Sequence, residues 1–231
     1  MINRPVLHEW NLQPEEAIAL QRKLAAKVIR TDQLPGEVRL VAGVDMAINE
    51  ETDMARAAVV LLFYPAMEVI ERHVYEEPVR MPYIPGLLSF REIPCILGAF
   101  ALLSQQPDLV MVDGQGIAHP RHLGIASHLG LWLDLPTIGC AKSILRGHYD
   151  EKALSEEAGT WVPLIFNRET VGAALRTRTR VKPMIISLGH RISLATSLHY
   201  VLACCKGYRL PEPTRQADKL SKDNSFHELS G

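Results

Sequence analysis

Two short apolar runs, each leading into an aspartate, constrain the fold of this chain more than any other feature. Residues 40–44 read Leu-Val-Ala-Gly-Val and precede Asp45, and residues 109–112 read Leu-Val-Met-Val and precede Asp113. Apolar runs of this length are typical of strands buried in an α/β sheet. An ionised carboxylate in such a place costs several kcal/mol unless a cation, N–H donors or a metal compensates it. We therefore expect both aspartates to have partners at one edge of a sheet.

The order of apolar patterns predicts an α/β fold with a central mixed sheet, in which three antiparallel strands are followed by parallel strands and helices flank both. If the first and fourth strands are neighbours, Asp45 and Asp113 lie side by side. In chain order we expect a helix over 14–30, strands over 38–48, 57–63 and 67–75, a helix over 90–104, a strand over 109–112, a helix over 121–133 and a strand over 136–141. Weaker patterns favour strands over 162–166, 171–176 and 184–187 and a helix over 192–204.

The chain has 231 residues without an internal repeat or a low-complexity linker, and we expect one domain over 1–231. The polar residues 221–231 are expected to form a disordered tail. No apolar run approaches the roughly 20 residues that a membrane span requires, so no membrane partner is expected. The N-terminus lacks the apolar core of a signal peptide, and the four cysteines lack the spacing of a zinc site. These features favour the reducing cytosol, and we expect a monomer there.

Charge is nearly balanced, with a formal net charge of −1, which by itself gives no indication of a nucleic-acid partner. The distribution is uneven, because five basic residues fall close together: Arg168, Arg176, Arg178, Arg180 and Lys182. A local basic face is therefore compatible with a chain that is almost neutral overall.

A third acid, Glu92, lies near the start of the helix expected over 90–104, and each of the three acids also has a structural explanation. Asp45 would be half of a buried ion pair, Asp113 with the glycine after it is typical of a turn, and Ser89 to Glu92 match the S-x-x-E capping box. Taken together, carboxylates without a thiolate or paired imidazoles suit a hard cation, Mg²⁺ or Mn²⁺ rather than zinc. Such a cation serves phosphoryl transfer on nucleic acid.

Six motifs cover nearly the whole chain: VAGVDMA, PYIPGLLSFRE, VDGQGIAHPRHLGIASHLG, IGCAKS, SLGHRISL and GYRLPEPTRQAD. In this order they resemble the successive motifs of the endonuclease V family, the deoxyinosine 3′ endonucleases. The resemblance implies a ribonuclease H-like fold and Mg²⁺-dependent DNA repair, with cleavage of the second phosphodiester 3′ to a deaminated purine that leaves 3′-hydroxyl and 5′-phosphate ends. It also implies metal ligation by Asp45, Asp113, Glu92 and Asp218; for Asp218, a solvated helix residue is the alternative.

A rigid aromatic turn opens the second motif, where Tyr83 and Ile84 lie between Pro82 and Pro85. A deaminated base has to leave the stack to be read, and Tyr83 is suited to fill the vacated space. A Pro-rich surface turn is the structural alternative. The resemblance also implies a base pocket lined by main chain at five positions: Gly86, Leu88, Gly114, Gly124 and Ile125. Glycine suits such a pocket, because main-chain groups reach a base edge only where side chains are absent.

Three further polar residues are candidates for the site. His119 precedes a proline at an expected helix start, where it would contact the cleaved phosphate or its water; a satisfied loop histidine is the alternative. Lys142 follows a buried strand and would pair with a phosphate or orient the nucleophilic water. His190 would contact the backbone of the substrate strand or cap the helix that follows it.

Two other classes of function stay open. A non-catalytic nucleic-acid binder would use the aromatic turn and the basic face, but it would not need the acids. Another ribonuclease H-like nuclease would act on branched DNA or RNA hybrids, but it would not need a base pocket. The expected partner is DNA containing deoxyinosine, and inosine-containing RNA is the second candidate, because a 2′-hydroxyl contact depends on side-chain placement.

Overall fold

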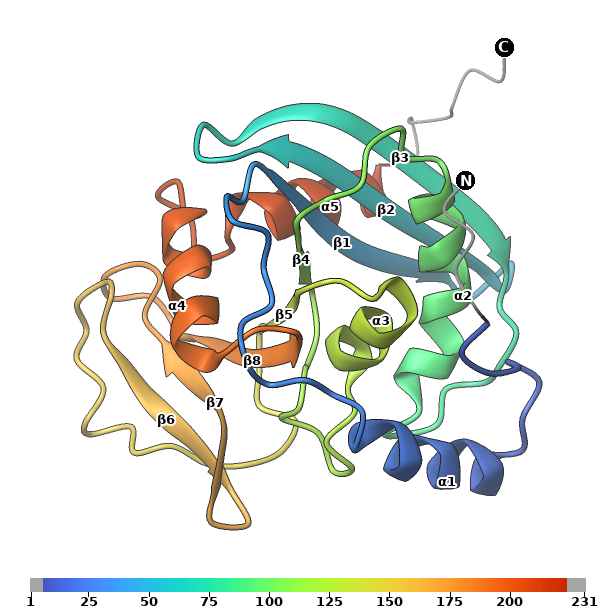
Figure 1. Ribbon diagram of the computed structural model, residues 1–231, viewed down its shortest axis with the longest axis horizontal. Helices are drawn as coiled ribbons and strands as arrows, with labels where there is room; N and C mark the ends of the chain where they lie inside the picture. The colour runs from blue at the N-terminus through green and yellow to red at the C-terminus, as the bar shows by residue number, and fades with distance from the viewer. Residues whose placement is uncertain (1–5, 224–231) are drawn as a thin grey trace.

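The computed structural model describes residues 6–223, in which helices flank both faces of one eight-stranded sheet (Figure 1). The strand order is β3-β2-β1-β4-β5-β8-β7-β6. In chain order the elements are α1 (Pro14–Ala25), β1 (Leu40–Asn49), β2 (Met54–Phe63), β3 (Glu68–Pro78), α2 (Leu88–Ala101), β4 (Leu109–Val112), α3 (Ile125–Leu133), β5 (Thr137–Ala141), β6 (Trp161–Phe166), β7 (Glu169–Leu175), β8 (Met184–His190), α4 (Leu194–Ala203) and α5 (Glu212–Lys222).

The sheet is mixed, as the sequence predicts. Strands β1, β4 and β5 are parallel, and strands β3, β2 and β1 form an antiparallel meander. On the other side, β8 is antiparallel to β5, and β7 and β6 continue the sheet with each strand antiparallel to the one before it. The pairing of β1 with β4 sets Val44 opposite Val112, so Asp45 and Asp113 leave the two strands side by side. The expectation that the first and fourth strands are neighbours is therefore confirmed.

Side-chain alternation along β1 separates two hydrophobic cores, one on each face of the sheet. Ala42 and Val44 belong to the core beneath α2 and α3, whereas Val41 belongs to the core beneath α4 and α5 (Figure 1). Gly43 also faces α5, and Asp45 follows it by two residues. The carboxylate of Asp45 is therefore directed to the α5 face.

Helix α5 is not among the elements that the sequence predicts. Its apolar face is narrow: Ala217 and Leu220 join the core, while Thr214 is a buried polar residue. Too few apolar side chains recur at helical spacing for the pattern to stand out. A Cβ at Gly43 would lie 1.9 Å from the carbonyl oxygen of Pro213, so α5 lies directly on the backbone of β1.

Two predicted helix boundaries are wrong by four or five residues. Helix α1 ends at Ala25 instead of residue 30. Beyond its end, the amide of Ile29 donates a hydrogen bond to the ring of His190. Helix α3 begins at Ile125 instead of residue 121, because His122 has a φ of +54°, in the left-handed region that ends helical geometry. In both places a tertiary contact or a loop conformation replaces a helical turn that the sequence pattern favours.

Ser221 and Lys222 are not part of the disordered tail that is expected over 221–231, because both belong to α5 and Ser221 is buried. The rest of that expected tail, residues 224–231, lies outside the described part of the chain. Within residues 6–223, none of the helices has the length and apolar character needed to cross a bilayer.

A Gly43→Ala substitution is expected to destabilise the protein, because the new Cβ would overlap the backbone of α5. Overpacking of this kind costs about 1–3 kcal/mol or more, and urea denaturation measures it as a loss in the free energy of unfolding. Gly36→Ala is the matched control, since Gly36 is exposed and a Cβ there would meet nothing within 4 Å. Equal stability of the two variants would contradict the close packing of α5 on β1.

Candidate active site

Three carboxylates meet at the edge where β1 and β4 end. Oxygens of Asp45, Asp113 and Asp218 all lie within 4.8 Å of one another. Parallel pairing of the two strands positions the first two, and α5 brings Asp218 to them across more than a hundred residues of sequence. The structure thus brings together three of the four acids that the sequence assigns to a metal site.

Asp45 is the most buried member of this group, with 9 % of its surface exposed. Its carboxylate accepts a hydrogen bond from the hydroxyl of Ser221 on α5. Burial raises the pKa of Asp45 to about 6; the Ser221 bond opposes this rise, and repulsion from Asp113 adds to it. The charge of Asp45 is therefore only partly compensated by the protein.

Lys142 follows β5 and lies between the other two carboxylates. Its Nζ is 2.5 Å from Asp113 and 2.8 Å from Asp218. Burial opposes the charge of Lys142, but hydrogen bonds to the two aspartates outweigh it and raise the pKa of the ammonium well above its ordinary value. Burial likewise pushes the pKa of Asp218 upward, while hydrogen bonds from Lys142 and Lys222 outweigh this effect and hold the pKa below its ordinary value.

Glu92 approaches the same edge from the other face of the sheet, on α2. Burial, and then repulsion from Asp45, raises the pKa of its carboxyl to about 8. The capping-box explanation is wrong: α2 begins at Leu88 without a side-chain cap, and the hydroxyl of Ser89 bonds to the ring of His128 instead. Glu92 is therefore close enough to feel the cluster, but it is not one of the three acids that share the 4.8 Å group.

The donor set of this group fits a hard divalent cation. All three atoms are carboxylate oxygens, without a thiolate or a ring nitrogen in the group. The raised pKa of Asp45 means that a further positive charge at this place would be favourable. Mg²⁺ or Mn²⁺ therefore suits the group better than zinc does.

Two residues that the sequence analysis does not single out hold the segment of Lys142 in place. Arg209 donates from one Nη to the carbonyl oxygens of Lys142 and Pro183, at 2.6 and 2.9 Å. Gln115 donates from Nε2 to the carbonyl oxygen of Ser143 at 2.8 Å. Their partners are main-chain oxygens, which carry no sequence signal, so only the coordinates reveal these roles.

The aromatic turn ends on a firmly held carbonyl group. Tyr83 is 63 % exposed. Behind it, the carbonyl oxygen of Gly86 accepts hydrogen bonds from Gln21 at 3.0 Å, from His119 at 3.2 Å and from Arg121 at 2.6 Å. Gly86 has a φ of +80°, which glycine adopts without strain. Tyr83 is thus an exposed aromatic side chain close to a fixed point of the backbone.

The glycines that the resemblance assigns to a base pocket are packed tightly within their own loops. A Cβ at Gly124 would lie 2.3 Å from the carbonyl oxygen of Gln115, and one at Gly114 would lie 2.4 Å from Cγ2 of Ile125. Gly124 and Ile125 are buried, whereas Leu88 is 36 % exposed. Loop packing therefore requires glycine here, which differs from the expected reason, direct access to a base. The binding role of these positions stays a prediction.

His119 is buried beside the aromatic turn, and both of its ring nitrogens have protein partners. Nε2 donates to the carbonyl oxygen of Gly86, and Nδ1 accepts from the amide of Arg121 at 3.2 Å. Burial, and then the charge of Arg121, lowers the pKa of His119 to about 4, so the ring is neutral at neutral pH. These contacts favour the satisfied loop histidine, and a contact with the cleaved phosphate stays a prediction.

His190 lies away from the acidic group. It pairs with Thr137 at the start of β5, whereas Lys142 follows the end of that strand. Its Nδ1 accepts from the amide of Ile29 at 3.2 Å, and its Nε2 lies 3.8 Å from Asp134. His190 is 3 % exposed, so the expected contact with the substrate is not supported by its position. It holds the segment after α1 against β8.

Known proteins match this chain in sequence over most of its length. The family model for Endonuclease V matches residues 22–219. The chain is 56 % identical to Endonuclease V of Gloeobacter violaceus over 217 residues, which cover 93 % of this chain and 87 % of that protein.

Solved structures agree with the sequence comparison. Endonuclease V from Streptomyces avermitilis superposes with a TM-score of 0.87 at 41 % identity, over 92 % of each chain. Endonuclease V from Ciona intestinalis, in complex with a 23mer DNA containing an inosine followed by a ribo-adenosine, superposes with a TM-score of 0.81 at 28 % identity, over 91 % of this chain and 97 % of that chain. The fold is ribonuclease H-like, and this chain belongs to the endonuclease V family, as a nuclease that acts on phosphodiester bonds.

Proposed function

We propose that this protein cuts DNA containing deoxyinosine at the second phosphodiester 3′ to the lesion and leaves 3′-hydroxyl and 5′-phosphate ends. The observation that carries the proposal is the group of Asp45, Asp113 and Asp218, whose oxygens lie within 4.8 Å of one another. The Ciona relative was solved with inosine-containing DNA, which supports the same lesion as the target here.

Each polar residue of the site has a distinct part in the proposed reaction. Mg²⁺, or Mn²⁺ in its place, would be held by Asp45, Asp113 and Asp218 and would activate water and stabilise charge on the scissile phosphate. Lys142 holds an ammonium group beside two of these acids, where it pairs with a phosphate oxygen or orients the attacking water. Glu92 holds a proton at neutral pH until additional positive charge arrives, because its pKa is about 8.

Lesion recognition is assigned to the aromatic turn. Inosine pairs weakly, so extruding it from the duplex costs less than extruding a normal base. Tyr83, exposed beside the held carbonyl of Gly86, fills the space that the base leaves. Because three donors hold Gly86, the tyrosine inserts with little further loss of backbone freedom.

Inosine-containing RNA is a second candidate substrate. The DNA bound to the Ciona relative carries a ribo-adenosine directly after the inosine, so a ribonucleotide is accommodated next to the lesion in that protein. Matched DNA and RNA oligonucleotides with one inosine, cut with and without Mg²⁺, distinguish the two substrates by rate and by cut position.

Asp113→Asn is expected to lower Mg²⁺-dependent nicking of inosine DNA by more than about 100-fold, because it removes a ligand charge and the partner of Lys142. Single-turnover assays measure the rate, and circular dichroism confirms that the variant is folded. Glu68→Gln is the matched control, since Glu68 is an exposed acid at the start of β3, at the other end of the sheet. Near wild-type nicking by Asp113→Asn would refute the proposed site.

Tyr83→Ala is expected to reduce the preference for inosine DNA over normal DNA by about tenfold, while binding to normal DNA changes little, because base–aromatic stacking contributes about 1–3 kcal/mol. Anisotropy titrations of both duplexes give the two affinities. Tyr83→Phe keeps the ring and is expected to keep the preference. An equal loss on both duplexes would count against the wedge role.

Metal binding is expected to release roughly one proton at pH 7 and close to none at pH 9.5. In the metal-free protein, the pKa values of Asp45 and Glu92 are raised to about 6 and 8, above unfolded values near 4. The contribution of these two carboxyl groups to the free energy of unfolding is therefore full below about pH 4, and it is lost as the pH rises through 6 and 8. A cation favours the ionised forms, so Mg²⁺ raises Tm more at pH 8 than at pH 6.

Calorimetric titrations of Mg²⁺ in buffers of different ionisation enthalpy measure this proton release. Glu92→Gln is the control variant, because it removes the group that is still protonated at pH 7. A release that does not depend on pH, or that Glu92→Gln leaves unchanged, would show that these carboxyls do not exchange their protons for the cation.

A further inference from the structure

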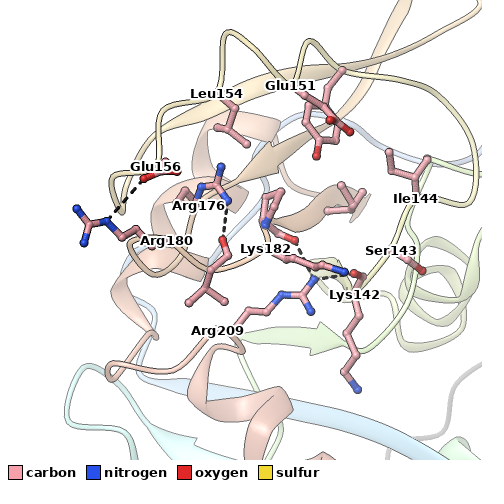
Figure 2. A pocket seen from close by; sticks show the side chains of 14 residues that line it. Lys142, Ser143, Ile144, Glu151, Leu154, Glu156, Arg176, Arg180, Lys182 and Arg209 are labelled. Atoms are coloured by element: carbon pink, nitrogen blue, oxygen red, sulfur yellow. Dashed lines mark hydrogen bonds and ion pairs between the residues drawn. The ribbon is translucent and has the colours of Figure 1, made fainter.

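A basic cleft of about 630 Å³ lies beside Lys142, outside the acidic group (Figure 2). Its walls come from the loop after β5, from the loop between β7 and β8, and from the segment before α5. The residues that matter for its chemistry are Lys142, Tyr149, Arg176, Arg180, Lys182 and Arg209. Three of these, Arg176, Arg180 and Lys182, belong to the basic stretch that the sequence analysis singles out and that the proposed reaction does not use.

The charge of the cleft is strongly positive in a chain whose net charge is −1. Five cationic residues line it against two carboxylates, Glu151 and Glu156. The ammonium of Lys142 pairs with Asp113 and Asp218, which leaves four cationic groups for the cleft. Arg180 is 82 % exposed and is paired only loosely, at 3.6 Å, with the equally open Glu156. Such exposed pairs are weak, so Arg180 remains available to another anion.

The cationic groups differ in how firmly they are held. The guanidinium of Arg176 donates to the carbonyl oxygens of Ser155 and Val181, at 3.1 and 2.6 Å, which fixes its position in the wall. Lys182 is exposed, and Figure 2 shows its side chain running along the cleft toward the segment of Lys142. The cleft thus combines two fixed guanidinium groups, those of Arg176 and Arg209, with exposed cations on long side chains, Arg180 and Lys182, which suits a chain of phosphates better than a single small anion.

The cleft continues the edge of the sheet on which the acids lie. Along that edge the strand order is β1, β4, β5, β8 and β7. Asp45 lies on β1, Asp113 directly follows β4, and Lys142 directly follows β5. The cleft begins where β8 starts and β7 ends. At about 4.8 Å between strands, β7 is roughly 14 Å from β4, a distance that about four nucleotides span along a duplex.

The connection between acids and cleft is rigid, because Arg209 bonds to the carbonyl oxygens of both Lys142 and Pro183. The positions assigned to lesion reading lie in the helix layer on the other face of the sheet, at the start of α2, which packs on β2 and β3, and at the start of α3, which packs on β5 and β8. In the proposed reaction the lesion lies 5′ of the cut. The part of the strand that lies 3′ of the cut therefore reaches the cleft.

We propose that this cleft binds the phosphates of the substrate strand on the 3′ side of the cut, through Arg180 and Lys182, with Tyr149 and Ile144 giving apolar surface for sugars and bases. The proposal rests on the proposed function for the direction of the strand. It adds a second contact region to the aromatic turn, so the scissile phosphate is held from both sides.

The test uses the doubly substituted Arg180→Gln/Lys182→Gln protein and two inosine duplexes with the same 5′ flank. In the short duplex the 3′ flank ends directly after the cut, and in the long duplex it ends ten nucleotides beyond the cut. Binding is measured by anisotropy without divalent cation, over a range of KCl concentrations. On the long duplex the variant should bind about tenfold more weakly at moderate salt, and its slope of log K against log salt should be smaller by about 1.8. On the short duplex it should match the wild type.

Two controls complete the experiment. Lys206→Gln removes one positive charge from an exposed lysine beside the β2–β3 turn, at the opposite edge of the sheet, and should bind both duplexes like the wild type. Arg180→Lys/Lys182→Arg keeps the charges and should retain the flank dependence.

A defect of the double variant that is equal on both duplexes, or that follows the length of the 5′ flank instead, would overturn the proposal. The proposed function is judged separately, by whether the wild-type protein with Mg²⁺ nicks inosine duplexes in preference to matched normal ones. Failure of that assay would leave the metal-free binding result intact. The binding experiment measures how affinity depends on the length of the 3′ flank, and it does not depend on the chemistry of the cut.

Discussion

The parallel pairing of β1 with β4 is the constraint on which the site depends. It sets Val44 opposite Val112, so that Asp45 and Asp113 leave neighbouring strands at the same level. Neighbouring strands are about 4.8 Å apart, and two carboxylates at that separation repel each other. Burial and this repulsion raise the pKa of Asp45 to about 6, which means that ionising its carboxyl group is unfavourable here. The sheet itself thus creates a place where additional positive charge is favourable.

The other charged and polar groups of the site come from elements that are remote in sequence. Helix α5 contributes Asp218, which adds negative charge, and the hydroxyl of Ser221, which donates to Asp45. Lys142, from the end of β5, bridges Asp113 and Asp218. The ammonium satisfies two of the three acids and leaves Asp45 with a hydroxyl partner, so the protein alone stabilises the group incompletely. This imbalance is what a metal site needs, because full compensation by lysine would leave no affinity for a cation.

The sequence predicts the parts of the site that depend on short apolar patterns. Asp45 and Asp113 are identifiable because four or five apolar residues precede each, and period-two alternation then fixes which face they share. Asp218 comes from the motif resemblance alone, since α5 buries too few apolar side chains to be recognised. The partners of His119 and His190 could not be predicted, because each is a main-chain group, the carbonyl of Gly86 and the amide of Ile29, that only tertiary structure brings near.

The motif to which we assign lesion reading and the acids to which we assign the cut are parts of one packed unit. His119 and Arg121, in the loop that leads from β4 to α3, hold the carbonyl of Gly86 at the start of α2, and Glu92 lies one turn further along that helix. Asp113 begins the same loop, directly after β4. The distance between the aromatic turn and the acidic group is therefore set by packed backbone and not by a mobile segment. Under the proposed function, this construction keeps the offset from lesion to cut constant, because displacement of the turn would disrupt the hydrogen bonds at Gly86.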